Sequence, residues 1–473
     1  MIEHTDTESS QDELEAQRHA GIRRWVREHF EAEVTNIIRL ERWRPQWKVT
    51  YRSKEESHAV LFRGDRPIAG RNDLRFEMEV MQILEAQGVK VPHIHGWVDE
   101  PKAFVMDWIE TEDRAPGMLH TAIENPTEMD DERWQAMLNS MTELARVHRV
   151  PVEAFAGIRR LSNPPKTPED IALHATEHMY KAGKMAGHID TPLEFLQTWL
   201  RRNVPMHRTE TRFIAGDAGQ FMSRGSEVLA LLDFEIANTG DTHWDLASFR
   251  GRHPYENMGD IPALYREYAR VTGEDVDLPV VCYYTAAFLQ LSAIGATFFG
   301  LPEARGGNWI EGMLEYASIT RRAYEAIAEK QGIPLDYDLS LPEATLHRWE
   351  DTGLRKLMID INQLPTSTAF APWERGLLHA IPEFLLNYSR YRDWFERESL
   401  EDINRLTGRK HASLAQADET AMEVIPETTE DADEAWVQAM HRRTLRLSMI
   451  LAGTDPDQTN PLFHRLDPIL DPP

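Results

Sequence analysis

The segment from Ile214 to Arg250 reads IAGDAGQFMSRGSEVLALLDFEIANTGDTHWDLASFR, and the rest of the chain is interpreted outward from it. Asp217 lies in a tight turn beside glycine, and Asp233 ends an apolar run. The twelve residues between Gln220 and Asp233 suit two short strands and a turn. Two acidic groups presented in this way can hold a proton and a magnesium ion beside a phosphate, which is what phosphoryl transfer requires.

Composition limits what the chain can be. Its 473 residues are too many for one compact core, and 41% hydrophobic and 27% charged residues are typical of a globular protein. The net charge of −26 argues against binding to nucleic acid or to anionic membranes. The single cysteine, Cys282, excludes an intrachain disulfide and a cysteine-based zinc site. The first thirty residues do not resemble a signal peptide and no apolar run reaches the length of a membrane span, so we expect a cytoplasmic protein.

The N-terminal part of the chain contains several runs of residues that favour β-structure. A helix is expected over about 12–30, before the first strand. The β-rich runs and the helix between them lie at 34–43, 47–55, 57–65, 72–87 (helix), 97–100 and 103–109. Three strands in succession indicate an antiparallel meander. The order predicts a small five-stranded lobe with one helix.

After Glu110 the sequence becomes mostly helical. We expect four parts, which are a tail and helix at 1–30, a β-rich nucleotide lobe at 31–110, a helical catalytic and acceptor lobe at 111–335, and an additional helical region at 336–473. Within the last part, the acidic segment 417–434 is expected to be a flexible linker.

Three ordered pieces carry a resemblance to a known family. They are AGD at Ala215–Asp217, LDFE at Leu232–Glu235 and GDTHWDLA at Gly240–Ala247. Following a five-stranded lobe, they resemble the aminoglycoside phosphotransferase and choline kinase-like family of small-molecule kinases. The resemblance covers about 34–330. It implies an α+β, protein kinase-like fold with two lobes, a small antiparallel N-terminal lobe and a larger helical C-terminal lobe, here with an extra C-terminal helical region.

The resemblance also implies roles for single residues. Asp217 matches the catalytic base that accepts the proton of the substrate hydroxyl, and Asp233 matches the magnesium ligand. Glu77 matches the helix carboxylate that pairs with a basic residue on the third strand. That residue is Arg63 here, where protein kinases have Lys.

The expected ligands follow from the same resemblance. Met106, Asp107, Trp108 and Ile109 match the hinge whose backbone meets the adenine. The phosphate donor is ATP, with GTP as an alternative, and the cofactor is Mg²⁺. The acceptor is a small hydroxylated molecule, with no nucleic-acid or membrane partner. A homo-oligomer formed through the C-terminal helices is a further alternative.

The chain departs from the family pattern at three places. Ala215 stands where the pattern has His, and Met222 stands where it has Asn. Met is a poor ligand for a hard cation, and we expect Gln220 to bind the metal instead. RPQW at 44–47 contains no glycine, although a glycine-rich loop belongs there. These departures motivate a rival, a nucleotide- or ligand-binding pseudokinase with a helical interaction module, and a third interpretation, a scaffold that binds no nucleotide.

Several polar residues are expected to be structural. Asp241 is interpreted first as a helix N-cap, and Asp245 as part of the scaffold of the catalytic loop. His148 is expected to end a helix, and Cys282 to be a buried, inert thiol.

Overall fold

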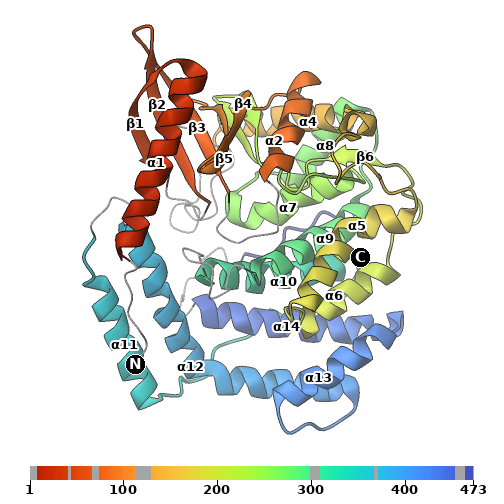
Figure 1. Ribbon diagram of the computed structural model, residues 1–473. Helices are drawn as coiled ribbons and strands as arrows, with labels where there is room; N and C mark the ends of the chain where they lie inside the picture. The colour runs from red at the N-terminus through yellow and green to blue at the C-terminus, as the bar shows by residue number, and fades with distance from the viewer. Residues whose placement is uncertain are drawn as a thin grey trace.

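The computed structural model describes residues 8–40, 44–65, 74–111, 129–298, 309–366, 371–452 and 464–471. The first strands and α1 gather at one end of the molecule, and α13 lies at the opposite end (Figure 1). Between them lies a large helical assembly.

A five-stranded antiparallel sheet with strand order β1-β2-β3-β5-β4 forms the small lobe. Its strands are β1 (Glu33–Arg39), β2 (Gln46–Ser53), β3 (Glu56–Gly64), β4 (Ile94–Asp99) and β5 (Lys102–Asp107). The predicted order of three strands, a helix and two strands is confirmed, and so is the two-lobe, protein kinase-like α+β fold. Strand β5 lies inside the sheet, and its successive side chains are buried on alternate faces.

One face of the sheet is covered by α1 (Glu8–Phe30). Ile22, Trp25 and Val26 of this helix pack against Val49 and Phe62 of the sheet. The expected N-terminal helix is therefore present and begins four residues before its expected start.

The other face is covered by α2 (Leu74–Ala86). Val80 and Leu84, spaced by one turn, share a core with Phe104 and Met106 of β5. This packing turns Glu77, which is 1% exposed, toward β3 rather than toward solvent. The helix thus brings a carboxylate to the underside of the sheet.

The larger part of the chain is helical and contains two short antiparallel ribbons. The ribbons pair β6 (Arg212–Ile214) with β9 (Asn238–Gly240), and β7 (Phe221–Arg224) with β8 (Glu227–Leu231). The helices are α4 (Asp131–Arg149), α5 (Pro168–Met185), α6 (Thr191–Arg202), α7 (His243–Glu256), α8 (Ile261–Thr272), α9 (Leu278–Ala296), α10 (Trp309–Gln331), α11 (Arg348–Asn362), α12 (Ala371–Thr407), α13 (Leu414–Val424) and α14 (Asp433–Ala452). Short 3₁₀ turns lie at Val152–Phe155, Ile425–Glu427 and Glu430–Ala432.

Helix α9 is the centre of this lobe. Its residues from Val280 to Ile294 are almost all buried against α5, α6, α7 and α10. By length and composition alone α9 could cross a membrane, but 72% of its apolar stretch is buried inside the fold, which is also typical of a core helix. Cys282 lies on this helix and is fully buried, as expected.

The prediction of a flexible linker in the acidic segment 417–434 is wrong, because the segment is folded. Its fully buried residues, four apart, form one stripe of α13 and the turn after it: Ala417, Ala421 and Ile425. Two of its acidic side chains form ion pairs: Asp418 Oδ2 accepts from Arg443 Nη2 at 2.9 Å, and Asp433 pairs with Arg202. A segment whose composition is typical of disorder therefore forms an amphipathic helix that packs against the rest of the fold.

The C-terminal helices join the main core. Trp436 and Met440 of α14 pack in the same cluster as Phe195 of α6 and Tyr324 of α10. The last described stretch, 464–471, lies against α10 and accepts from Arg250 through the Asp467 carbonyl at 2.8 Å.

Candidate active site

The turn that carries Asp217 follows β6 and depends on glycine. Gly216 has φ +85°, and a Cβ at this position would lie 2.3 Å from the Ile236 carbonyl oxygen. Only glycine avoids both the backbone penalty and this contact. The Asp245 carboxylate fixes the turn from below, because its two oxygens accept from the backbone N–H groups of Ala215 (2.7 Å) and Gly216 (2.8 Å).

Asp245 is itself held in place. His148 Nε2 lies 2.9 Å from Asp245 Oδ2, and His148 Nδ1 lies 2.6 Å from the Tyr268 hydroxyl. Trp244 Nε1 donates to the Gly216 carbonyl at 2.8 Å. Asp245 thus acts as scaffold, as expected, and His148 ends α4 as expected but also supports the turn that carries Asp217. The loop is fixed although Ala215 replaces the family's His.

Asp241 supports the same region from the other end of the ribbon. It accepts two hydrogen bonds from Arg208, at 2.8 and 2.9 Å, and the backbone N–H of His243 donates to it at 3.0 Å. Burial raises its pKa, but His243 and Arg208 outweigh burial and hold the pKa below its ordinary value. Thr242 directly precedes α7 but makes no side-chain cap hydrogen bond, whereas the Asp241 carboxylate accepts from the His243 N–H, so Asp241 caps the first turn of the helix as expected.

The Asp217 carboxylate lies between two donors. Its Oδ1 accepts from Arg252 Nη1 at 2.7 Å and its Oδ2 accepts from Gln220 Nε2 at 3.0 Å. Burial, together with the nearby Asp233 and Glu256 carboxylates, raises the pKa of Asp217 to about 7, although Arg252 works against them. A carboxylate with this pKa can take a proton near neutral pH.

Arg252 and Glu256 of α7 adjoin the Asp217 carboxylate and were not identified from the sequence. The Arg252 guanidinium donates to both Glu256 oxygens at 3.0 Å while it also contacts Asp217. The spacing of four residues was visible as a helical ion pair, but nothing local indicated that it faces Asp217.

Asp233 lies two residues beyond β8 in a strained conformation, with φ +67°. Its Oδ1 accepts from Arg63 Nη2 at 2.8 Å, and its Oδ2 accepts from Gln220 Nε2 at 3.0 Å. The Gln220 amide therefore joins Asp217 to Asp233. In this orientation its NH₂ group faces the carboxylates, so binding a metal through its oxygen requires the amide to turn over. Its role as a metal ligand stays a prediction.

Arg63 and Glu77 meet as expected. Arg63 Nε donates to Glu77 Oε2 at 2.9 Å, across the space between β3 and α2. Burial lowers the pKa of Arg63, but the carboxylates of Glu77 and Asp233 raise it above its ordinary value. The guanidinium stays charged and lies where phosphates could reach it.

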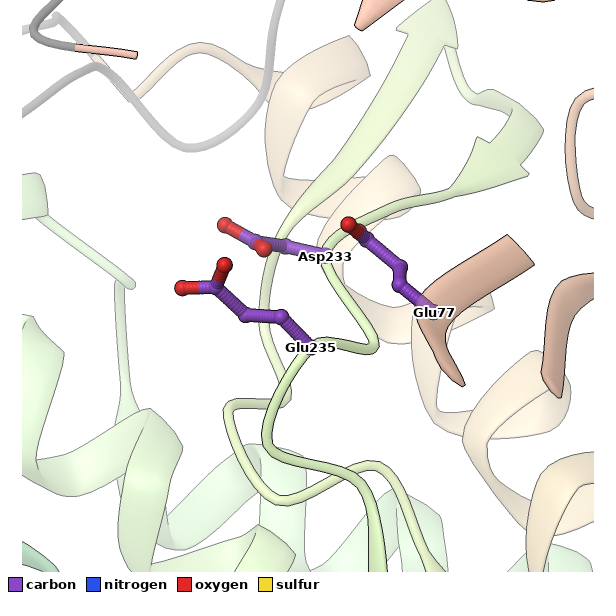
Figure 2. A group of neighbouring side chains, drawn as sticks. All are labelled: Glu77, Asp233 and Glu235. Carbon is purple, nitrogen blue, oxygen red and sulfur yellow. The ribbon is translucent and has the colours of Figure 1, made fainter. Parts of the chain in front are cut away.

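Three carboxylates gather here. Figure 2 shows Glu77 from α2 beside Asp233 and Glu235 from the segment after β8, and oxygens of the three lie within 4.8 Å of one another. Oxygen ligands in this number fit a hard divalent cation. Glu235 was quoted in the LDFE motif but given no role, and it forms an ion pair with Arg44 from the turn before β2.

A cavity of about 300 Å³ lies between the lobes at this point. Its apolar lining comes from both lobes: Leu40, Leu61, Met81, Met222 and Leu232. The expected hinge residues Met106, Asp107, Trp108 and Ile109 line it as well. Met222 thus contributes an apolar wall instead of the metal ligand found at its position in the family pattern.

Comparison with known proteins places the chain in a family. The model of the phosphotransferase enzyme family matches residues 42–284, more than half of the chain. No curated protein matches the chain.

Several solved structures are similar to the chain at low sequence identity. An aminoglycoside phosphotransferase APH(4)-Ia in complex with ADP and hygromycin B is 11% identical (64% of this chain and 98% of that chain covered, TM-score 0.42). An ethanolamine kinase from Plasmodium vivax is 11% identical (67% and 95% covered, TM-score 0.43). A choline kinase from Cryptosporidium parvum is 13% identical (66% and 96% covered, TM-score 0.42). With the family match over 42–284, the chain belongs to the phosphotransferase enzyme family and is a small-molecule kinase with an alcohol acceptor.

Proposed function

We propose that this protein transfers the γ-phosphate of ATP to a hydroxyl group of a small molecule. The observation that carries the proposal is the bridge Asp217–Gln220–Asp233, with both hydrogen bonds at 3.0 Å. It places a candidate base and a candidate metal ligand on two sides of one amide, at the edge of the interlobe cavity. Phosphoryl transfer needs little covalent chemistry from the protein, so catalysis is positioning and charge stabilisation.

Asp217 accepts the proton of the acceptor hydroxyl. Its raised pKa of about 7 makes it a stronger base than an ordinary carboxylate, while it remains half ionised at neutral pH. Arg252 orients the carboxylate by its 2.7 Å hydrogen bond and keeps the pKa from rising further.

The carboxylates of Asp233, Glu235 and Glu77 would hold Mg²⁺ when a nucleotide is bound. When bound there, the ion would supply positive charge that neutralises the negative charge developing on the phosphates. Arg63 stays paired with Glu77 and directs its remaining N–H groups at the phosphates.

The nucleoside occupies the apolar part of the cavity. The backbone of Met106–Ile109 meets the base, and Leu61 and Met222 contact its two faces. We expect ATP as the donor, with GTP as the alternative. The backbone contacts of the hinge with the base would decide between the two.

One of the three departures that motivated the pseudokinase interpretation, Ala215 in place of His, does not disturb the turn. Asp245 holds the backbone N–H groups of Ala215 and Gly216 directly, so the missing His does not leave the turn loose.

The acceptor is a small hydroxylated molecule reached by Asp217 on the side of α7.

The test is ADP release from ATP and Mg²⁺ across a panel of polyols, amino alcohols, aminoglycosides and apolar hydroxylated metabolites. At least one acceptor should accelerate ADP release in the wild type and yield a phosphorylated product by mass spectrometry. Asp217→Asn should abolish that gain, whereas Asp275→Asn, a matched change at an exposed carboxylate, should retain it. Equal acceptor-dependent release from wild type and Asp217→Asn would contradict the proposal.

A further inference from the structure

The segment between β1 and β2 has no glycine, and its described residues, Leu40, Arg44 and Pro45, are held by hydrogen bonds. Arg39 Nη1 donates to the carbonyls of Leu40 (3.0 Å), Arg44 (3.2 Å) and Gln46 (3.3 Å). The Leu40 N–H donates to the Gln46 carbonyl at 2.9 Å. Since the guanidinium gathers three carbonyls, these carbonyls face Arg39 and not the cavity.

The next residue removes a backbone donor. Pro45 has no N–H, and its carbonyl accepts from Gly64 of β3 at 2.7 Å. A glycine-rich loop binds phosphates through backbone N–H groups. Pro45 cannot do so, and another donor at the edge of the cavity can meet the phosphates of a nucleotide there.

That group is the Arg44 side chain. It is 4% exposed and forms an ion pair with Glu235, which is 14% exposed and belongs to the other lobe. Arg44 and Arg63 line the same cavity as Glu77, Asp233 and Glu235. A buried guanidinium is costly without an anion, so Arg44 can leave Glu235 only if another anion replaces it.

We propose that Arg44 binds the phosphates of the nucleotide and takes the place of the glycine-rich loop, exchanging Glu235 for phosphate when the magnesium nucleotide enters. This inference rests on the proposed nucleotide site. The exchange is balanced in charge, because Glu235 turns to the magnesium ion as Arg44 turns to the phosphates. The planar guanidinium suits the exchange, since its parallel N–H groups match carboxylate and phosphate oxygens equally well.

The proposal assigns Arg44 a contact with the phosphates and none with the nucleoside. Calorimetric binding of ATP, compared with that of adenosine, therefore tests it. In Arg44→Ala, ATP with Mg²⁺ should bind at least about tenfold more weakly, as expected for one lost charge-assisted contact. Adenosine should bind as in the wild type, because it has no phosphate. Arg44→Lys should lie between the two, and Arg52→Ala, at an exposed arginine of β2, should bind both ligands normally.

A second arm tests the exchange itself. Without Mg²⁺, Glu235→Gln removes the competitor for Arg44, so ATP should bind several-fold more tightly than to the wild type. With Mg²⁺ the same variant should bind ATP more weakly. In the double variant Arg44→Ala/Glu235→Gln the gain without Mg²⁺ should vanish.

The outcomes are distinct. Wild-type ATP affinity in Arg44→Ala overturns the inference and leaves the proposed kinase function standing. Equal weakening of ATP and adenosine also overturns it, because the variant then damages the whole cavity. No binding of ATP by the wild type overturns both the inference and the proposed nucleotide site.

Discussion

The raised pKa of Asp217 predicts how stability depends on pH. Burial and neighbouring carboxylates shift this group from 3.8 to about 7 in the folded protein. The folded state therefore holds the proton more tightly than the unfolded state does. The resulting stabilisation is complete below pH 3.8 and is lost as the pH rises through about 7.

The size of the effect follows from the two values. Between pH 5.5 and 8, titration of Asp217 should cost the wild type about 2 kcal/mol of unfolding free energy. Asp217→Asn cannot titrate and should lack this loss. Its stability should rise relative to the wild type by that amount over the same interval.

The assay is urea denaturation followed by tryptophan fluorescence at pH 5.5, 6.5, 7.2 and 8, with wild type, Asp217→Asn and Asp275→Asn. A difference between the two pH trends in the transition that unfolds the Asp217 region is the readout, because pH effects common to both proteins cancel. Asp275→Asn should follow the wild type. If Asp217→Asn also ran parallel to the wild type, the carboxylate would not carry the raised pKa and the reasoning would be refuted.

Three further predictions concern the same site and the core behind it. Arg252→Met removes the cation that opposes the raised pKa of Asp217, so the pH profile of kcat/KM should move to higher pH by at least about one unit; an unmoved profile would contradict the contact. Gly216→Ala places a Cβ 2.3 Å from the Ile236 carbonyl and should lower the unfolding free energy by at least about 2 kcal/mol, measured by denaturation. Burial raises the pKa of Cys282 to about 12, so iodoacetamide should label it only after unfolding, as mass spectrometry can verify.

The small lobe was predictable because its signals are local. Buried and less buried residues alternate within 47–65, as expected for strands. The apolar stripe that includes Phe76 and Val80 defines α2. The pairing of Arg63 with Glu77 was implied by the family resemblance and is present in the structure.

The contacts around Asp217 were not predictable from local signals. Arg252 reaches Asp217 from 35 residues away, and Arg44 reaches Glu235 from 191 residues away. No periodicity specifies which face of a turn or helix meets a distant loop. Those contacts depend on how the lobes and α7 are arranged, which only the folded chain determines.

The prediction for the acidic segment 417–434 was wrong for a different reason. Its composition matches that of disordered chains, but Ala417, Ala421 and Ile425 are spaced as one helical stripe. The stripe is made mainly of small residues, so it contributes little hydrophobic signal by itself. The helix is stabilised by packing against α6 and α12 and by the ion pair between Arg443 and Asp418.

The most direct test of the central claim compares nucleotide binding with turnover in Asp217→Asn and Asp233→Ala. Calorimetry with ATP, with and without Mg²⁺, gives binding, and ADP release with a productive acceptor gives turnover. The account predicts that Asp217→Asn binds magnesium ATP within about twofold of the wild type but does not turn over, and that Asp233→Ala loses the magnesium dependence of binding. Wild-type turnover in Asp217→Asn, or unchanged magnesium dependence in Asp233→Ala, would contradict the account.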